Sequence, residues 1–172
     1  MANIEIVPFS EENAMHFTRL NTGWLEKYFF VEPIDHQMLN DPKHFFIDQG
    51  GYIFFAKING EVAGTFALLK ESKGVYELSK MAVYEKYQGI KIGNVMIEFC
   101  IEKAAALKLT KLILYSNTKL LPAIHLYKKY GFIEVPITDS IYKRSNIKME
   151  LANGERPVRD IAFTIDHSPL TL

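Results

Sequence analysis

The chain has 172 residues, of which 48% are apolar and 13% aromatic, so it can bury a real core and is not of the disordered class. Its 20 basic and 20 acidic residues cancel, which gives no reason to expect nucleic acid or an anionic membrane as a partner. No apolar run approaches the roughly 18 residues of a membrane span, and we expect no signal segment. One cysteine, Cys100, excludes an internal disulfide and fits a buried core position in a cytoplasmic protein.

The first fifty residues predict a strand followed by helices. Residues 3–7 read as the strand, and Ser10 is a good N-cap for a helix that runs to Tyr28 unless Gly23 divides it. A second, short helix is predicted over residues 35–39. The aromatic side chains of this segment either roof a pocket or cover the sheet.

A hairpin and a buried strand come next. The runs 52–58 and 61–70 flank Asn59-Gly60, a pair that accepts positive φ and suits a two-residue hairpin turn. After a turn at 71–74, residues 75–83 are apolar and β-branched enough for a strand that is mostly buried.

A glycine-containing loop separates that strand from a long apolar helix, which begins at Ile92. The loop reads Gln88-Gly89-Ile90-Lys91-Ile92-Gly93-Asn94. The first amides of a helix have no partner within the helix, and its N-terminus carries roughly +0.5 of a charge, so the loop is a ready seat for a phosphate or pyrophosphate. An ordinary strand-to-helix turn is the alternative interpretation of these residues.

The C-terminal half continues the alternation of strands and helices. We predict a strand at 110–116, a helix at 122–130 that ends before Gly131, and strands at 132–142 and 145–151. Three strands in succession, then strand, helix, strand, helix, strand, predict a mixed sheet flanked by helices.

The domain organisation is expected to be simple. Residues 1–152 form one domain, and 153–172 form a tail. Within the tail, residues 161–165 could add a strand or pair with a second chain, which would make a homodimer.

Two motifs, one after the other along the chain, resemble those of a known family. The loop from Gln88 to Gly93 matches the pattern [Arg/Gln]-x-x-Gly-x-[Gly/Ala], with Lys91 in place of a glycine, and Asn117 precedes a helix that ends in Leu-Tyr-x-x-x-Gly-Phe at residues 126–132. In both motifs, and over roughly residues 52–151, the chain resembles the GNAT superfamily of acyl-CoA-dependent N-acetyltransferases. Glu85, where the family commonly has proline, is a further departure, and a negative φ would accommodate Lys91.

The resemblance implies an α/β fold: a mixed, largely antiparallel sheet of about seven strands with a splayed parallel pair. It implies that acetyl-CoA lies in the V between the strand ending at Val83 and the strand ending at Ser116. Unpaired backbone groups of the V would bind the pantetheine arm, because such groups need partners. The implied cofactor-binding residues are Met81, Val83, Gln88, Gly89, Ile90, Lys91, Ile92, Gly93, Asn94, Asn117 and Tyr127.

The implied catalytic residues are Glu77 and Tyr127. Glu77 stands where many members keep a glutamate that removes the proton of the amine. A carboxylate of ordinary pKa, about 4.3, is a poor direct base, so we expect Glu77 to act through a water molecule. The alternative interpretation of Glu77 is a carboxylate at the edge of the sheet that pairs with a surface lysine. Tyr127 would donate to the departing thiolate, or else serve as a core tyrosine. Asn117 either binds pantetheine or caps the next helix.

The predicted activity is therefore acetyl transfer from acetyl-CoA to a primary amine of a small molecule or peptide. Glu26, Glu32 and Asp35, beside aromatic residues, could favour a cationic amine. The five histidines lack metal-ligand spacing, so no metal is expected. Two alternatives stay open: a catalytically silent acyl-CoA sensor, and an α/β domain for another phosphate-bearing ligand.

Overall fold

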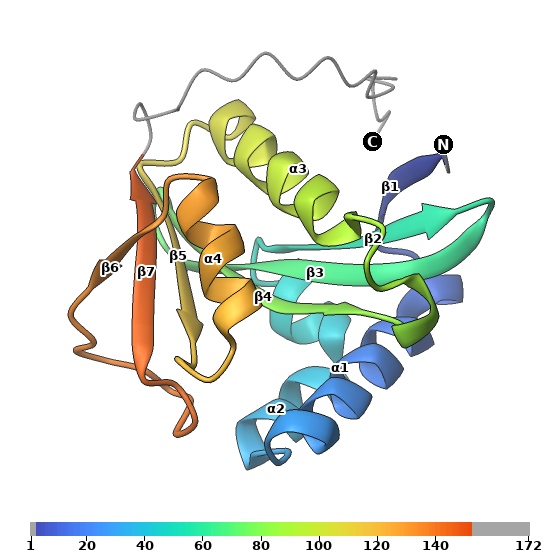
Figure 1. Ribbon diagram of the computed structural model, residues 1–172, viewed down its shortest axis with the longest axis horizontal. Coiled ribbons are helices and arrows are strands. Elements are labelled where there is room, and N and C mark those ends of the chain that lie inside the picture. The colour runs from blue at the N-terminus through green and yellow to red at the C-terminus, as the bar shows by residue number, and fades with distance from the viewer. Residues whose placement is uncertain (1–2, 153–172) are drawn as a thin grey trace.

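Apolar side chains on both faces of the central strands organise the protein as one sheet covered by helices on each side (Figure 1). The computed structural model describes residues 3–152. The strands are β1 Ile4–Pro8, β2 Tyr52–Ile58, β3 Glu61–Ser72, β4 Val75–Val83, β5 Lys111–Ser116, β6 Ile133–Val135 and β7 Ile147–Ala152. The helices are α1 Ala14–Tyr28, α2 Pro33–Asn40, α3 Ile92–Ala106 and α4 Leu121–Lys129, with short turns η1 Glu11–Asn13, η2 Lys43–Ile47 and η3 Glu85–Tyr87.

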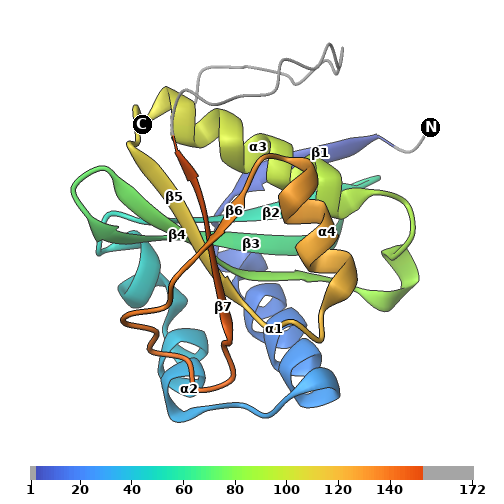
Figure 2. The same ribbon diagram turned by 60° about the vertical axis from the view of Figure 1, so that its left-hand side comes forward.

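The described strands form one seven-stranded sheet in the order β1-β2-β3-β4-β5-β7-β6. The pair β4–β5 is parallel, and the other neighbouring pairs are antiparallel. In Figure 1 β5 and β7 lie side by side with β6 at the edge, and Figure 2 shows α3 on one side of the strands and α1 and α2 on the other. The predicted mixed, largely antiparallel sheet with helical layers is confirmed.

Each face of the sheet has its own core. On one face α3 and α4 pack on the strands, with Met96 and Cys100 fully buried in that cluster. On the other face α1, α2 and η2 provide Phe17, Met38 and Phe46. The aromatic N-terminal segment therefore covers the sheet, and the predicted core position of Cys100 is confirmed.

Local sequence decides the β2–β3 hairpin. Asn59 and Gly60 have φ of +50° and +82°, the left-handed values that the Asn-Gly turn predicted. The strand β4 and the start of α3 also lie at the predicted residues.

The predicted helix runs to Tyr28 as one element, and Gly23 does not divide it, because the helix buries Phe17, Leu20 and Leu25 along one side and this packing outweighs one glycine. Two other local predictions are wrong. Ser10 makes no side-chain cap, since the chain enters α1 through the short turn η1. Of residues 132–142 only Ile133–Val135 form a strand, and the rest is loop. The predicted tail, 153–172, lies outside the described residues.

A β-bulge in β4 changes which side chains face α1 and α2. Thr65 pairs with Ala82 but Ala67 pairs with Ser79, so β4 has one extra residue at this point. Lys80 takes up the extra residue with a left-handed φ of +53°. The bulge places Glu77, Ser79 and Lys80 on the same side of the sheet, toward α2, where Lys80 meets Asp35.

Candidate active site

The parallel strands β4 and β5 part half-way along their length. Their pairing consists of Val75 with Lys111, Tyr76 with Leu112, and Glu77 with Ile113. Beyond Glu77, β4 stays paired with β3, and β5 stays paired with β7 as far as Ser116. The two strands therefore form a V that opens from Glu77, as the resemblance implied.

A cavity of about 180 Å³ occupies the opening of the V. Because the strands have separated, it is lined by residues from both helical layers, including Trp24 and Phe29 of the α1 side and Leu126 and Tyr127 of α4. Glu77 lies at its apex, where pairing stops. Two aromatic residues of the N-terminal segment, Trp24 and Phe29, thus roof this pocket, while others of the segment cover the sheet.

The start of α3 presents a series of open amides beside the V. The first helical backbone bond runs from the Val95 amide to the Lys91 carbonyl at 3.3 Å. Within residues 3–152, the amides of residues 89–94 donate to no protein acceptor. Open amides at a helix N-terminus favour the binding of an anion such as a phosphate group.

The conformation of Lys91 differs from the expected one. Its φ is +64°, left-handed, so the expectation of a negative φ is wrong. A side chain at this φ costs roughly 1–2 kcal/mol, which explains why glycine suits the position. The turn also uses Gly89 at φ +82°, and Gln88 donates through Nε2 to the Val83 carbonyl at 3.5 Å.

The backbone of β4 faces the V at alternate residues. The Tyr84 amide donates to the Ala63 carbonyl of β3 at 2.9 Å. Because backbone groups alternate in direction along a strand, the amides of Val83 and Met81 point the other way, into the opening. These two residues hold the position predicted for pantetheine contacts.

Tyr127 faces the cavity from α4. Its hydroxyl has no hydrogen-bond partner among the described residues, and burial raises its pKa to about 12. Its ring packs against Phe132 at 5.9 Å between centroids, which holds the side chain in place. A neutral phenol with a free hydroxyl in a cavity is a hydrogen-bond donor without an acceptor of its own.

Glu77 is deeply buried, with 2% of its surface exposed, and its Oε2 has no hydrogen-bond partner within the described part of the chain. Burial is the main cause that raises its pKa to about 8, and the neighbouring Glu71 adds to the shift. It lies on a central strand and pairs with no lysine, so the alternative of an edge carboxylate in a surface ion pair is wrong. An unpaired buried carboxyl is costly and marks a candidate proton-transfer group.

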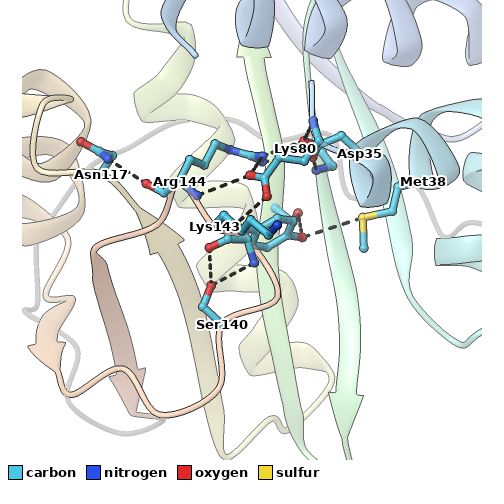
Figure 3. Close-up of polar contacts among 10 residues, drawn as sticks. Asp35, Met38, Lys80, Asn117, Ser140, Lys143 and Arg144 are labelled. Atoms are coloured by element: carbon cyan, nitrogen blue, oxygen red, sulfur yellow. Dashed lines mark hydrogen bonds and ion pairs between the residues drawn. The ribbon is translucent and has the colours of Figure 1, made fainter. Parts of the chain in front are cut away.

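A cluster of buried charges lies beside Glu77. Lys80 Nζ is 2.6 Å from Asp35 Oδ1, and Arg144 donates to both Asp35 and Glu32 (Figure 3). Burial opposes ionisation of Asp35, but Arg144 and Lys80 outweigh it and lower its pKa overall. Glu32 and Asp35 are therefore neutralised by protein cations. The expectation from the sequence that they attract a cationic amine is not met, because neither carboxylate is free.

Asn117 holds the β6–β7 loop in place. Its Nδ2 donates to the Arg144 carbonyl at 2.7 Å, and its Oδ1 accepts from the Lys119 amide at 2.9 Å. It does not cap α4, whose N-cap residue is Leu120. A side-chain bond from Asn117 to a cofactor would compete with these contacts.

Three further residues line the cavity and were not predicted from the sequence, namely Lys80, Tyr142 and Arg144. Lys80 had a usable signal, because a lysine inside an otherwise apolar strand requires a buried partner. Arg144 had none, because its carboxylate partners lie 109 and 112 residues away in the chain.

The comparisons with known proteins agree with this geometry. A family model described as the acetyltransferase (GNAT) family matches residues 17–132. The chain belongs to the GNAT family of acetyltransferases. This is a family that uses acetyl-CoA.

Solved structures share the fold at low sequence identity. A GNAT acetyltransferase from Staphylococcus aureus Mu50 has a TM-score of 0.78 at 19% identity, covering 87% of this chain and 99% of that one. A Bacillus subtilis acetyltransferase in complex with CoA has a TM-score of 0.67 at 20% identity, with coverages of 87% and 99%. Spermidine N-acetyltransferase from Vibrio cholerae, in complex with CoA and spermine, has a TM-score of 0.68 at 16% identity, with coverages of 87% and 95%.

Among curated proteins, none matches the chain. In residues 3–152, no three His, Cys, Asp or Glu side chains are grouped so that they could hold a metal ion. None of the helices in that range is long and apolar enough to cross a membrane.

Proposed function

We propose that this acetyltransferase, with residues 1–152 as its catalytic domain, transfers the acetyl group of acetyl-CoA to a primary amine of a small molecule or peptide. The observation that carries the proposal is the buried carboxyl of Glu77, whose Oε2 has no partner in the described residues, at the apex of a cavity that Tyr127 also lines. One wall can bind the thioester arm, and the other can receive the amine and its proton.

The open backbone of the V binds acetyl-CoA, which supplies the activated acyl group. The amides of residues 89–94 hold the diphosphate, and those of Met81 and Val83 hold the pantetheine arm. One of the β4 amides also donates to the thioester carbonyl oxygen, and a donor of this kind is worth on the order of 10²–10³ in rate.

Glu77 removes the proton of the amine. An ammonium of pKa about 10.4 must lose its proton to attack, which costs roughly 4.6 kcal/mol at pH 7. With its pKa raised to about 8, Glu77 is a much better matched base than an ordinary carboxylate of pKa about 4.3. A water molecule between Glu77 and the amine is the path that we propose for this proton.

Tyr127 stabilises the departing thiolate. A thiol pKa of about 8.5 lies well below the pKa of about 12 of this phenol, so Tyr127 donates a hydrogen bond rather than transferring its proton fully. The C–N bond forms and the C–S bond breaks. The first proton of the ammonium leaves through Glu77, and the second proton, which the nitrogen loses as it becomes an amide, converts the CoA thiolate to the thiol.

Direct attack of the amine fits the nucleophiles available. Cys100, the single cysteine of the sequence, is fully buried in the core, and burial raises the pKa of its thiol far above the usual range. A covalent acyl-cysteine intermediate therefore has no support, and transfer within a ternary complex is the mechanism that we propose.

The test is incubation of an amine library with acetyl-CoA, with products identified by mass spectrometry. We expect N-acetylated products that disappear in the Glu77→Gln variant. Tight binding of CoA without turnover of any amine would favour the silent sensor instead. Thermal stabilisation by ATP or NAD equal to that by acetyl-CoA would favour a domain for another phosphate-bearing ligand.

A further inference from the structure

The guanidinium of Arg144 is used along two of its edges. Its terminal nitrogens donate in parallel to Asp35, NH1 to Oδ2 at 2.6 Å and NH2 to Oδ1 at 3.0 Å. NH1 also donates to Glu32 Oε2 at 2.7 Å. These three bonds use both hydrogens of NH1 and one hydrogen of NH2.

The remaining edge of Arg144 has no acceptor in the described residues. It consists of the Nε–H and the second hydrogen of NH2, which lie in the guanidinium plane and point in parallel from the same edge. This side-on edge matches the two oxygens of a carboxylate. The Tyr142 ring lies against the same group, 4.9 Å from Cζ, and keeps it from rotating.

Arg144 lines the cavity, whereas its protein partners Glu32 and Asp35 do not. Because its other donors are bonded to these partners, the open edge is the part of the guanidinium that remains for a ligand in the cavity. The side chain of Arg144 is 14% exposed, compared with 3% for Glu32 and none for Asp35. Figure 3 shows Arg144 reaching from its loop to Asp35 of α2 and Lys80 of β4.

The other cation of the cluster is not available in the same way. Lys80 donates to Asp35, and its side chain is 4% exposed. Two carboxylates and two cations leave the cluster balanced in charge, with Glu77 largely protonated below pH 8. A ligand anion would therefore be recognised by the geometry of the open edge of Arg144, rather than by an excess of positive charge.

We propose that the acceptor carries a carboxylate beside its amine, as an amino acid does, and that the side-on edge of Arg144 binds this carboxylate while the amine faces Glu77. This inference rests on the proposed acetyl transfer and narrows its substrate class. The apolar walls formed by Trp24, Leu25 and Phe29 leave a nonpolar surface for the side chain of such an acceptor.

The first experiment compares matched substrates on the unmodified protein. Glycine, beta-alanine, L-leucine and L-phenylalanine are each assayed beside the corresponding carboxamide, with rates expressed per free amine. Because two charge-assisted bonds are lost with the carboxamide, we expect at least one acid to exceed its carboxamide by about tenfold or more in kcat/KM, chiefly through KM. Equal values in every pair would overturn the inference.

The second experiment locates the preference at Arg144. In Arg144→Lys the charge near Asp35 and Glu32 is kept but the two-donor edge is lost, so the preference should fall to about threefold or less. Lys143→Gln is the matched control, since it removes the exposed side-chain charge next door and keeps the backbone amide bonded to Glu32. An unchanged preference in Arg144→Lys would contradict the assignment.

A binding measurement separates this inference from the proposed function. Thermal stabilisation of the CoA-bound protein by N-acetyl-L-leucine is compared with that by N-acetyl-L-leucinamide. Selective stabilisation by the acid without turnover of any amine would support the carboxylate subsite and overturn acetyl transfer. Turnover of amines irrespective of a carboxylate, with equal stabilisation by both compounds, would leave acetyl transfer in place and overturn the subsite.

Discussion

The two sides of the cavity are built from different chemical groups. On the α3 and α4 side the available groups are mostly backbone amides, at the start of α3 and along β4 beyond Glu77, and the one side-chain group assigned a role there is the hydroxyl of Tyr127. On the α1 and α2 side they are side chains, namely the carboxyl of Glu77 and a buried cluster of Lys80, Arg144, Asp35 and Glu32.

This difference suits two tasks, binding a constant cosubstrate on one side and recognising a particular acceptor on the other. A backbone-built seat depends on chain direction and on a few glycine-like positions, so it tolerates many side chains and serves a constant cosubstrate. A side-chain cluster depends on each residue present, so it can distinguish one acceptor from another. Substitutions on the two sides should therefore have different consequences.

The largest effect is expected at Glu77. Glu77→Gln removes the proton acceptor and should lower kcat by about 10²–10⁴. Because the base is the ionised form, activity of the unsubstituted protein should rise as pH increases through about 8, and the variant should lose this rise. A pH–rate profile of both proteins provides the measurement.

Glu71→Gln is the matched control for Glu77. The charge of Glu71 is one cause of the raised pKa of Glu77, so this variant should stay active and shift the rise to lower pH. An identical profile in all three proteins would show that Glu77 is not the group that titrates.

Asp35→Asn should produce the largest loss of stability. The substitution leaves Lys80 and Arg144 buried without their shared counter-charge, which should cost about 3–5 kcal/mol of unfolding free energy. Urea unfolding near pH 7 gives this value. Asp48→Asn is the comparison, because it breaks an exposed ion pair with Lys43 and should cost less than about 1 kcal/mol.

Tyr127→Phe should lower kcat by about 10²-fold, the lower end of the range for proton-transfer groups, since the phenol donates only a hydrogen bond. The KM for acetyl-CoA should change little, because the diphosphate seat is unaffected. Steady-state kinetics with both substrates varied measures the change in kcat and the change in KM separately. Tyr52→Phe, in which the altered ring stacks on Phe54 away from the cavity, should leave kcat unchanged. A kcat for Tyr127→Phe equal to that of this control would remove the role of the hydroxyl.

The smallest effect is expected at Lys91. Lys91→Gly relieves a left-handed φ of +64° and should raise stability by no more than about 1 kcal/mol, because the added flexibility of the unfolded chain offsets part of the gain. Lys91→Ala keeps the strained conformation and removes the ammonium, so a comparison of acetyl-CoA affinity between this variant and the unsubstituted protein isolates the contribution of the charge. A lower urea midpoint for Lys91→Gly than for the unsubstituted protein would contradict this account.

The features that could be predicted from the sequence are those with a local cause. Asn59-Gly60 specifies its own turn, and the apolar run of β4 specifies a buried strand. The open amides before Ile92 follow from where a helix begins. The opening of the V was implied by the resemblance of two motifs, the second of which includes the lining residues Asn117, Leu126 and Tyr127.

The features that could not be predicted depend on contacts between distant segments. Packing of α1 on the sheet overrides Gly23, and the bulge at Lys80 follows from pairing between β3 and β4. Arg144 and Asp35 lie 109 residues apart, so each one reads locally as an ordinary surface charge. The raised pKa of Glu77 likewise needs the burial that the fold provides.

Backbone amide hydrogen exchange, with and without acetyl-CoA, tests the central claim most directly. Acetyl-CoA should slow exchange at residues 89–94 and at Met81 and Val83, because the ligand would bind the amides that lack protein acceptors. Amides of the β1–β2 pair, far from the V in the sheet order, serve as the internal reference. Unchanged exchange in the loop and in β4 at saturating acetyl-CoA would contradict the account.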